Sequence, residues 1–100
     1  MNTLDLSIII INFNTSSYTL NCVESIFKQT SKNLTFEIIV IDNNSSISDF
    51  LTLEESLLQL NHSNVKLIRS QINSGFGGGN MCGAGLASGK FLCFLNNDSL

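Results

Sequence analysis

The stretch FLCFLNND, residues 91–98, decides the fold that this sequence predicts. It is a short apolar run that ends abruptly in Asn96, Asn97 and Asp98. The run is too short to span a membrane, and its apolar character favours a fully buried strand of a parallel sheet. Ligands of open α/β sheets bind just beyond the carboxyl ends of such strands. Asp98 is therefore a candidate ligand for a divalent cation, because carboxylate oxygens suit hard cations.

Two earlier apolar runs, residues 7–14 and 36–45, also end in polar side chains. The amides and the carboxylate at these ends are Asn12, Asn14, Asp42, Asn43 and Asn44. Because the carboxyl ends of parallel strands lie at one edge of a sheet, the three ends together outline one pocket. The alternative is that Asn and Asp end these strands only because both residues suit turns.

Composition limits the class of protein. A chain of 100 residues predicts one domain, and 43% hydrophobic with 13% charged residues excludes a disordered chain. The net charge is −3 and no basic run is present, so we expect no nucleic-acid partner. A phosphorylated small ligand is still compatible with this charge, because backbone N–H groups and a metal ion can hold it.

The cysteines and the N-terminus indicate a reducing compartment. Cys22, Cys82 and Cys93 form no CxxC motif, and the only histidine, His62, falls in an expected helix–strand connection, so a zinc site is not predicted. Neither a signal peptide nor an apolar run of membrane length is present. We therefore expect a cytoplasmic protein with reduced thiols.

The hydrophobic pattern predicts a βαβαβαβ chain. The four expected strands cover residues 6–13, 36–41, 65–69 and 91–95. Right-handed crossovers arrange such a chain as a Rossmann-like α/β half, with a mostly parallel sheet and helices on both faces. The expected strand order is 3-2-1-4, which places the topological switch point between the first and fourth strands.

Two helices are expected between the first three strands. Any of the hydroxyl residues 15–17 can cap the first helix, which extends to about Thr30. Residues 43–48 are expected to form a loop. Thr52 and Glu55 then have the spacing of a capping box, so the second helix is predicted to begin near Thr52.

A glycine-rich segment, residues 75–79, precedes a third expected helix over residues 81–87, and Gly89 would end that helix as its C′ residue. The segment is not a full dinucleotide fingerprint, because Asn80 replaces a required glycine and the segment follows the third strand. Residues 88–90, Ser-Gly-Lys, are likewise no phosphate-binding loop, because they precede a strand.

Together these motifs resemble the N-terminal half of the family 2 glycosyltransferases, which have the GT-A fold, and most closely their bacterial rhamnosyltransferase-type members. The matching segments, in family order, are SIIIINFN (7–14), CVESI with QT (22–30), EIIVIDNNSS (37–46), NSGFGGGN (73–80) and LNND (95–98). They cover nearly the whole chain. The last occupies the place of the family's DxD motif, with Asn96 in place of the first Asp.

The resemblance implies transfer of a sugar from a nucleotide-diphosphate-sugar donor to an acceptor hydroxyl, with inversion at the anomeric carbon. The donor would be UDP-, dTDP- or GDP-linked. The acceptor would be a glycan or a lipid-linked group, as in cell-surface polysaccharide synthesis. Such an enzyme would be cytoplasmic or peripheral at the inner face of the membrane.

The resemblance also implies roles for individual residues. Those that would bind the nucleotide sugar are Asn12, Asn14, Thr15, Asp42, Asn44, Gly75, Gly79, Asn80 and Asn96. Asp42 would contact the base or ribose, and residues 12–15 would wall the base pocket. The glycines would let the backbone approach the donor. Asp98 would bind Mg²⁺ or Mn²⁺ that bridges the diphosphate, as the one carboxylate of the motif.

The family's catalytic base and most of its acceptor site lie beyond the DxD motif, whereas this sequence ends two residues after Asp98. Glu24, Glu54 and Glu55 fall on expected helices, away from the strand ends. We therefore expect residues 1–100 to be one donor-binding half-domain that does not transfer sugar alone. Its fourth strand would expose an apolar edge that favours homo-oligomers. The alternative interpretation is a non-catalytic Rossmann-like module that binds a nucleotide or a protein.

Overall fold

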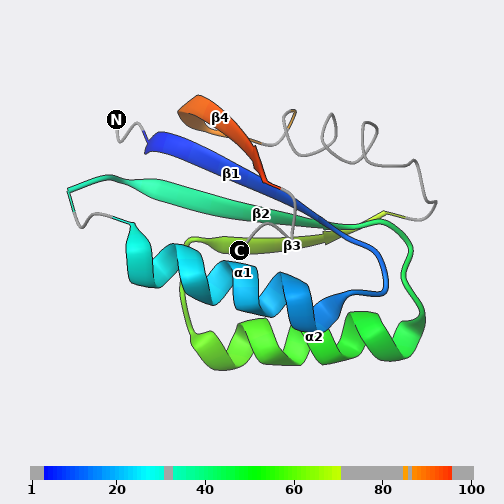
Figure 1. The fold of residues 1–100 in the computed structure, drawn as a ribbon. Helices are drawn as coiled ribbons and strands as arrows, with labels where there is room; N and C mark the ends of the chain where they lie inside the picture. Colours follow the sequence, from blue (N-terminus) through cyan, green and yellow to red (C-terminus); the bar gives the residue numbers. More distant parts are fainter. Residues whose placement is uncertain (1–3, 31–32, 71–84, 86, 96–100) are drawn as a thin grey trace.

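The computed structural model describes residues 4–30, 33–70, 85 and 87–95 (Figure 1). Its elements are β1 (Leu4–Asn12), α1 (Ser16–Gln29), β2 (Phe36–Asp42), α2 (Ile47–Leu60), β3 (Val65–Arg69) and β4 (Gly89–Leu95). The four strands form one parallel sheet in the order β3-β2-β1-β4. The predicted α/β class and strand order are confirmed.

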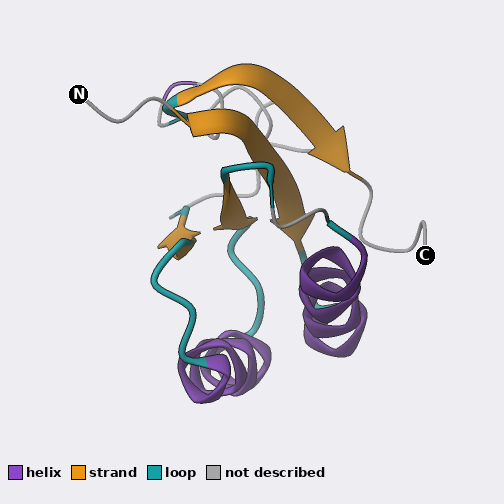
Figure 2. Ribbon diagram, turned by 90° about the vertical axis from the view of Figure 1, so that its left-hand side faces the viewer, coloured by secondary structure: helices purple, strands orange, loops and turns teal. Residues whose placement is uncertain are grey.

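Both described helices cover the same face of the sheet (Figure 2). Each lies in the connection between two parallel strands, β1 to β2 and β2 to β3. Such connections are right-handed in nearly all proteins. Helices on both faces would require the third helix expected over 81–87, which lies outside the described residues except for Gly85 and Ala87. None of the described helices has both the length and the apolar character needed to cross a membrane.

The two central strands are buried on both faces, as their continuous apolar sequences predict. On the helix side, the buried residues of the core are Ile8, Ile10, Cys22, Val23, Ile38, Val40, Leu53 and Leu57. On the other side, Ile9, Ile39 and Ile41 form a second buried cluster. Alternate side chains of one strand therefore serve two cores, because successive residues point to opposite faces.

The expectation of a fully buried fourth strand is wrong. β4 is an edge strand of the described sheet, and Phe91 is 71% exposed, with Leu92 and Phe94 also exposed. The apolar run predicted a strand correctly, but its side chains are covered only in part: Cys93 and Leu95 pack against the helix-side core, whereas the other apolar side chains are exposed. Gly89 is the first residue of β4 rather than the end of a helix.

The predicted start of the second helix is also wrong. α2 begins at Ile47, and Ser46 is its N-cap, with Oγ accepting a hydrogen bond from the backbone N–H of Asp49 at 3.3 Å. Thr52 lies inside the helix and donates its hydroxyl to the carbonyl of Ser48 at 2.8 Å. Thr52 and Glu55 have the spacing of a capping box, but the true cap, Ser46, lies six residues before Thr52.

Two leucines on α2 provide a matched test of the helix-side core. Leu53 is completely buried, whereas Leu58 on the same helix is 73% exposed. Leu53→Ala is expected to lower the free energy of unfolding by about 2–5 kcal/mol, because it removes core contacts and leaves a cavity. Leu58→Ala should change it by less than about 0.5 kcal/mol. Urea unfolding followed by circular dichroism measures both, and equal losses would contradict this packing.

Candidate functional site

The carboxyl ends of three strands meet at one edge of the sheet (Figure 1). The register pairs Asn12 of β1 with Asp42 of β2, and Asp42 with Arg69 of β3. Three polar side chains thus end three adjacent strands at the same level. The edge is the position at which open α/β sheets bind ligands.

Asp42 is the centre of this edge. It is fully buried, and its two oxygens accept four hydrogen bonds. Oδ1 accepts from Nδ2 of Asn12 at 2.8 Å and from Oγ of Ser45 at 2.6 Å. Oδ2 accepts from the backbone N–H of Ser45 at 3.1 Å and from the guanidinium of Arg69 at 2.9 Å. These donors replace the water that a buried carboxylate loses.

Asn12 connects the strand ends to both helices. Besides its bond to the β2 carboxylate, its Nδ2 lies 3.2 Å from Oγ of Ser45 and 3.0 Å from Oδ2 of Asp49. Its Oδ1 accepts from the hydroxyls of Thr19 at 2.6 Å and Thr15 at 3.4 Å. One amide therefore holds the start of α1 and the start of α2 against β1.

Two asparagines turn the chain after β1 and β2. Asn14 and Asn44 have φ angles of 54° and 62°, in the left-handed region that asparagine tolerates better than most residues. Asn14 receives a hydrogen bond from the backbone N–H of Ser46 at 2.8 Å and donates its own N–H to Oγ of Ser45 at 2.9 Å. Both asparagines are exposed. They are the polar groups of the edge that a ligand in solvent can reach.

Asp49 bridges the two helix starts. Its Oδ1 accepts from the backbone N–H of Ser16, the first residue of α1, at 3.1 Å, while Oδ2 accepts from Asn12. Burial raises the pKa of this carboxyl, but the hydrogen bonds from Asn12 and Ser16 outweigh that effect and hold the pKa below its usual range. A charged carboxylate in the first turn of α2 also suits the helix dipole.

Arg69 closes the site from β3. Besides its ion pair with Asp42, it donates a hydrogen bond to the carbonyl of Ser45 at 2.9 Å. Its guanidinium carbon lies 4.7 Å from the ring centroid of Phe50 on α2, within the range of a cation–π contact. Arg69 thus fixes the loop between β2 and α2 from two sides.

The structure brings together five of the predicted site residues, namely Asn12, Asn14, Thr15, Asp42 and Asn44. The others, namely Gly75, Gly79, Asn80, Asn96 and the metal candidate Asp98, lie outside the described residues.

Several residues of the site had no role in the sequence analysis, among them Thr19, Ser45, Asp49 and Arg69. Arg69 could have been found, since it ends the strand predicted to lie beside Asp42. Asp49 could not have been found, because the second helix was predicted to begin near Thr52, whereas Asp49 lies in the first turn of α2.

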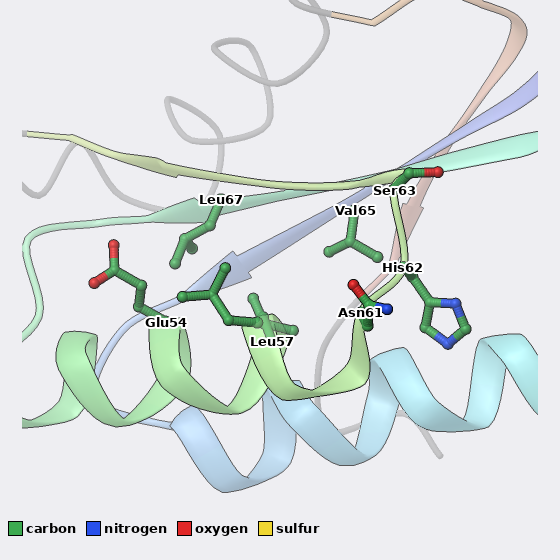
Figure 3. A pocket seen from close by; sticks show the side chains of 8 residues that line it. Glu54, Leu57, Asn61, His62, Ser63, Val65 and Leu67 are labelled. Carbon is green, nitrogen blue, oxygen red and sulfur yellow. The ribbon is translucent and has the colours of Figure 1, made fainter.

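Two hollows lie near α2. A polar hollow of about 420 Å³ beside the strand ends is lined by Asn14, Ser16, Ser46, Ser48, Asp49 and Thr52. Figure 3 shows another, of about 380 Å³, between α2 and β3; Leu57, Val65 and Leu67 contribute apolar lining and Glu54 and His62 polar lining. No predicted site residue lines the second hollow, so the strand-end edge is the candidate functional site.

The described part of the chain holds no group of three or more His, Cys, Asp or Glu placed to bind a metal ion. Asp42 and Asp49 at the edge are already engaged by hydrogen bonds from the protein. Glu24 and Glu54 lie on α1 and α2. Among the residues described, the edge therefore offers amides and hydroxyls to a ligand rather than a free carboxylate.

Arg69 provides a test of how this edge is held. Arg69→Met is expected to lower the free energy of unfolding by about 1–3 kcal/mol, because a buried carboxylate loses a charged donor. Arg69→Lys keeps the charge but cannot bridge Asp42 and the Ser45 carbonyl in a fixed fork, so an intermediate loss is expected. Chemical unfolding measures both variants. A lysine variant as stable as the wild type would show that the forked geometry is unimportant.

Comparison with known proteins agrees with this geometry. The Glycosyl transferase family 2 model matches residues 7–100. The chain is 37% identical over 93 residues to polypeptide N-acetylgalactosaminyltransferase 11 of Xenopus tropicalis, a match that covers 91% of this chain. The chain spans 16% of the length of that relative.

Two solved structures extend the comparison. The structure of GalNAc-T7 with UDP, GalNAc and Mn²⁺ superposes with a TM-score of 0.82 at 26% identity, covering 96% of this chain and 18% of that one. S. aureus TarS 1–349 with UDP-GlcNAc superposes with a TM-score of 0.74 at 25% identity, covering 95% and 27%. The sheet is that of the GT-A glycosyltransferases, and the chain belongs to glycosyl transferase family 2.

Proposed function

We propose that this chain forms the donor-binding part of a glycosyltransferase that moves a sugar from a nucleotide-diphosphate-sugar to an acceptor hydroxyl. The observation that carries the proposal is the edge where Asn12 and Asp42 hold two exposed loops at the ends of β1 and β2. The family match, and the UDP and UDP-GlcNAc in the structures of the two neighbours, support a nucleotide sugar as the ligand.

The proposed contacts divide between exposed and buried residues. Residues 12–15 would wall the base pocket, where Asn14 is exposed and Thr15 is half-buried, and the exposed Asn44 would bind the nucleotide sugar. Asp42 is the proposed partner of the base or ribose. Because its oxygens already accept four hydrogen bonds, donor binding must exchange one of them or add a fifth. Gly75, Gly79, Asn80 and Asn96 complete the proposed donor contacts.

Asp98 is the proposed ligand for Mg²⁺ or Mn²⁺. The described carboxylates of the edge are engaged by the protein, which leaves Asp98 as the proposed metal residue in the LNND motif. A divalent cation there would stabilise the negative charge that develops on the leaving nucleoside diphosphate. The Mn²⁺ in the GalNAc-T7 complex supports this choice of ion.

The finer proposals concern the rest of the reaction. We propose inversion at the anomeric carbon, a glycan or lipid-linked acceptor, and a role in cell-surface polysaccharide synthesis at the cytoplasmic face of the membrane. We also propose that the catalytic base lies outside this chain. In support, Glu24, Glu54 and Glu55 lie on helices, and the chain spans 16% of the length of the relative described above.

A binding titration tests the donor site. We expect one of UDP, dTDP and GDP to bind the chain in the presence of Mn²⁺, and Asp98→Ala to weaken that binding at least about tenfold, equivalent to 1.4 kcal/mol. Asp5→Ala is the matched control, because Asp5 lies near the start of β1, away from the strand ends. Calorimetry with and without Mn²⁺ measures each affinity.

Each result of this titration has a distinct meaning. Nucleotide binding that ignores both Mn²⁺ and Asp98→Ala would contradict the metal assignment but keep the nucleotide site. No binding of any nucleotide by the folded chain would contradict the donor-binding proposal. If a longer protein that contains this chain also binds the nucleotide specifically but transfers no sugar, the non-catalytic module would be favoured.

The exposed edge strand generates a second prediction. We propose that the chain forms homo-oligomers through β4, whose Phe91 and Phe94 side chains are exposed. Phe91→Lys is expected to shift the chain to monomers, because charge on an edge strand opposes pairing. Leu58→Lys is the matched control, since Leu58 is equally exposed but lies on α2. Light scattering over a wide concentration range measures the mass, and a strictly monomeric wild type would contradict the proposal.

A further inference from the structure

A second buried polar cluster lies toward the amino end of the sheet, on the face opposite α1 and α2. Its centre is Glu37 of β2, which is 2% exposed although it is a carboxylate. Oε2 of Glu37 accepts from the hydroxyl of Ser7 at 2.6 Å and from the backbone N–H of Ser88 at 2.7 Å. The oxygen of Ser7 in turn accepts from the backbone N–H of Gly89 at 2.7 Å. We call these two side chains with their two backbone partners the β4 latch.

The latch joins the two central strands to the backbone at the start of β4. Glu37 and Ser7 belong to the two central strands, whereas the backbone donors are Gly89, the first residue of β4, and Ser88, the residue before it. The other oxygen of Glu37 pairs with Nζ of Lys66 on β3 at 3.2 Å. Burial raises the pKa of Glu37, but the hydrogen bonds from Ser7 and Ser88 and the pairing with Lys66 outweigh it and hold the pKa below its usual range.

Burial of its side chains fixes the register of β4 only weakly. A strand with one buried face has its register set by burial, because a slip of one residue moves its apolar side chains to the other face. The sequence FLCFL of β4 is apolar on both faces, and Phe91, Leu92 and Phe94 are all exposed. Burial therefore distinguishes poorly between the observed register and a slipped one.

Gly89 shows how closely the latch holds β4. A Cβ atom at this position would lie 2.6 Å from the backbone carbon of Leu6, and also 2.6 Å from the backbone nitrogen and Oγ of Ser7. Only glycine allows β1 and the start of β4 to approach this closely. In a slipped register a residue with a side chain would meet the same atoms, so the contact itself opposes the slip.

We propose that Glu37, acting through Ser7, sets the register of β4 against β1 and is a positioning residue for the donor site. The inference rests on the proposed function, because the LNND motif with the proposed metal ligand begins at the other end of β4. The register pairs Leu95 with Ile10, and Asp98 follows Leu95 by three positions. A slip of one residue would move Leu95, the first residue of the LNND motif, by about 3.3 Å along β1 and exchange the two faces of β4. Because Asp98 belongs to the same motif, we expect such a slip to weaken the binding of Mn²⁺ with nucleotide.

The test compares Glu37→Gln with a matched carboxylate. Asp5 lies on β1 two residues before Ser7 and accepts hydrogen bonds from the backbone and hydroxyl of Thr35 at 3.0 Å each, so Asp5→Asn removes a charge without touching the latch. NMR on the whole chain measures two properties of β4. These are the exchange rates of the Ser88 and Gly89 amides, and the cross-strand contacts between Ile8 and Cys93, which are paired in the sheet. Calorimetry with Mn²⁺ and the nucleotide that the wild type binds measures the donor site.

We expect Glu37→Gln to keep α1 and α2 folded while the two latch amides exchange at least about tenfold faster, since a buried charged acceptor is lost. The Ile8–Cys93 contacts should weaken or be joined by those of a slipped register. The affinity for Mn²⁺ with nucleotide should fall about tenfold. Asp5→Asn should leave all three measurements within about twofold of the wild type.

Several outcomes would overturn the inference. Unchanged exchange and cross-strand contacts in Glu37→Gln would show that the latch does not set the register. A disturbed β4 with unchanged affinity would show that the latch is structural only. If the wild type binds no nucleotide, the proposed function fails and the positioning role falls with it, although the NMR measurements still decide the register. If Glu37→Gln does not fold, Ser7→Ala provides the same test, because it removes the hydroxyl that joins Glu37 to the Gly89 amide while the carboxylate stays in place.

Discussion

The structure depends on the buried hydrogen bond between Asn12 and Asp42, the last residues of the two central strands. An amide and a carboxylate inside an apolar sheet are costly unless every polar atom has a partner. The chain meets that requirement with Ser45, Asp49 and Arg69, which come from the following loop, helix and strand. The strand ends, both helix starts and the loop after β2 are therefore fixed by one network, and the exposed side of that network is the candidate donor surface.

The two buried carboxylates of β2 have different roles in the sheet. Asp42, at the carboxyl end, organises the surface that a ligand can reach, and Glu37, near the amino end, holds the start of β4. Between them the strand is continuously apolar and serves both cores. Apolar burial supplies stability without direction, whereas the hydrogen bonds at the two ends specify which neighbour each strand has and in which register.

Sequence reasoning predicted the strands and their order because buried parallel strands have continuous apolar runs that only a few topologies can connect. It also brought Asn12, Asn14, Thr15, Asp42 and Asn44 to one edge, since all of them follow the ends of neighbouring strands. It misplaced the start of α2 because Thr52 and Glu55 have capping-box spacing inside a helix that Ser46 caps. It overestimated the burial of β4 because an apolar run does not reveal how much of each face of the strand other elements cover.

What the sequence by itself determined is the class of the fold, the family, and the edge of the sheet where polar residues gather, because these follow from patterns local to each strand. Only the tertiary structure decided which hydrogen-bond donor pairs with which acceptor. The pairing of Arg69 with Asp42, of Asp49 with the start of α1, and of Glu37 with the start of β4 joins residues 27, 33 and 51 positions apart. Such pairs form only when the sheet has brought its strands together, so no local sequence pattern predicts them.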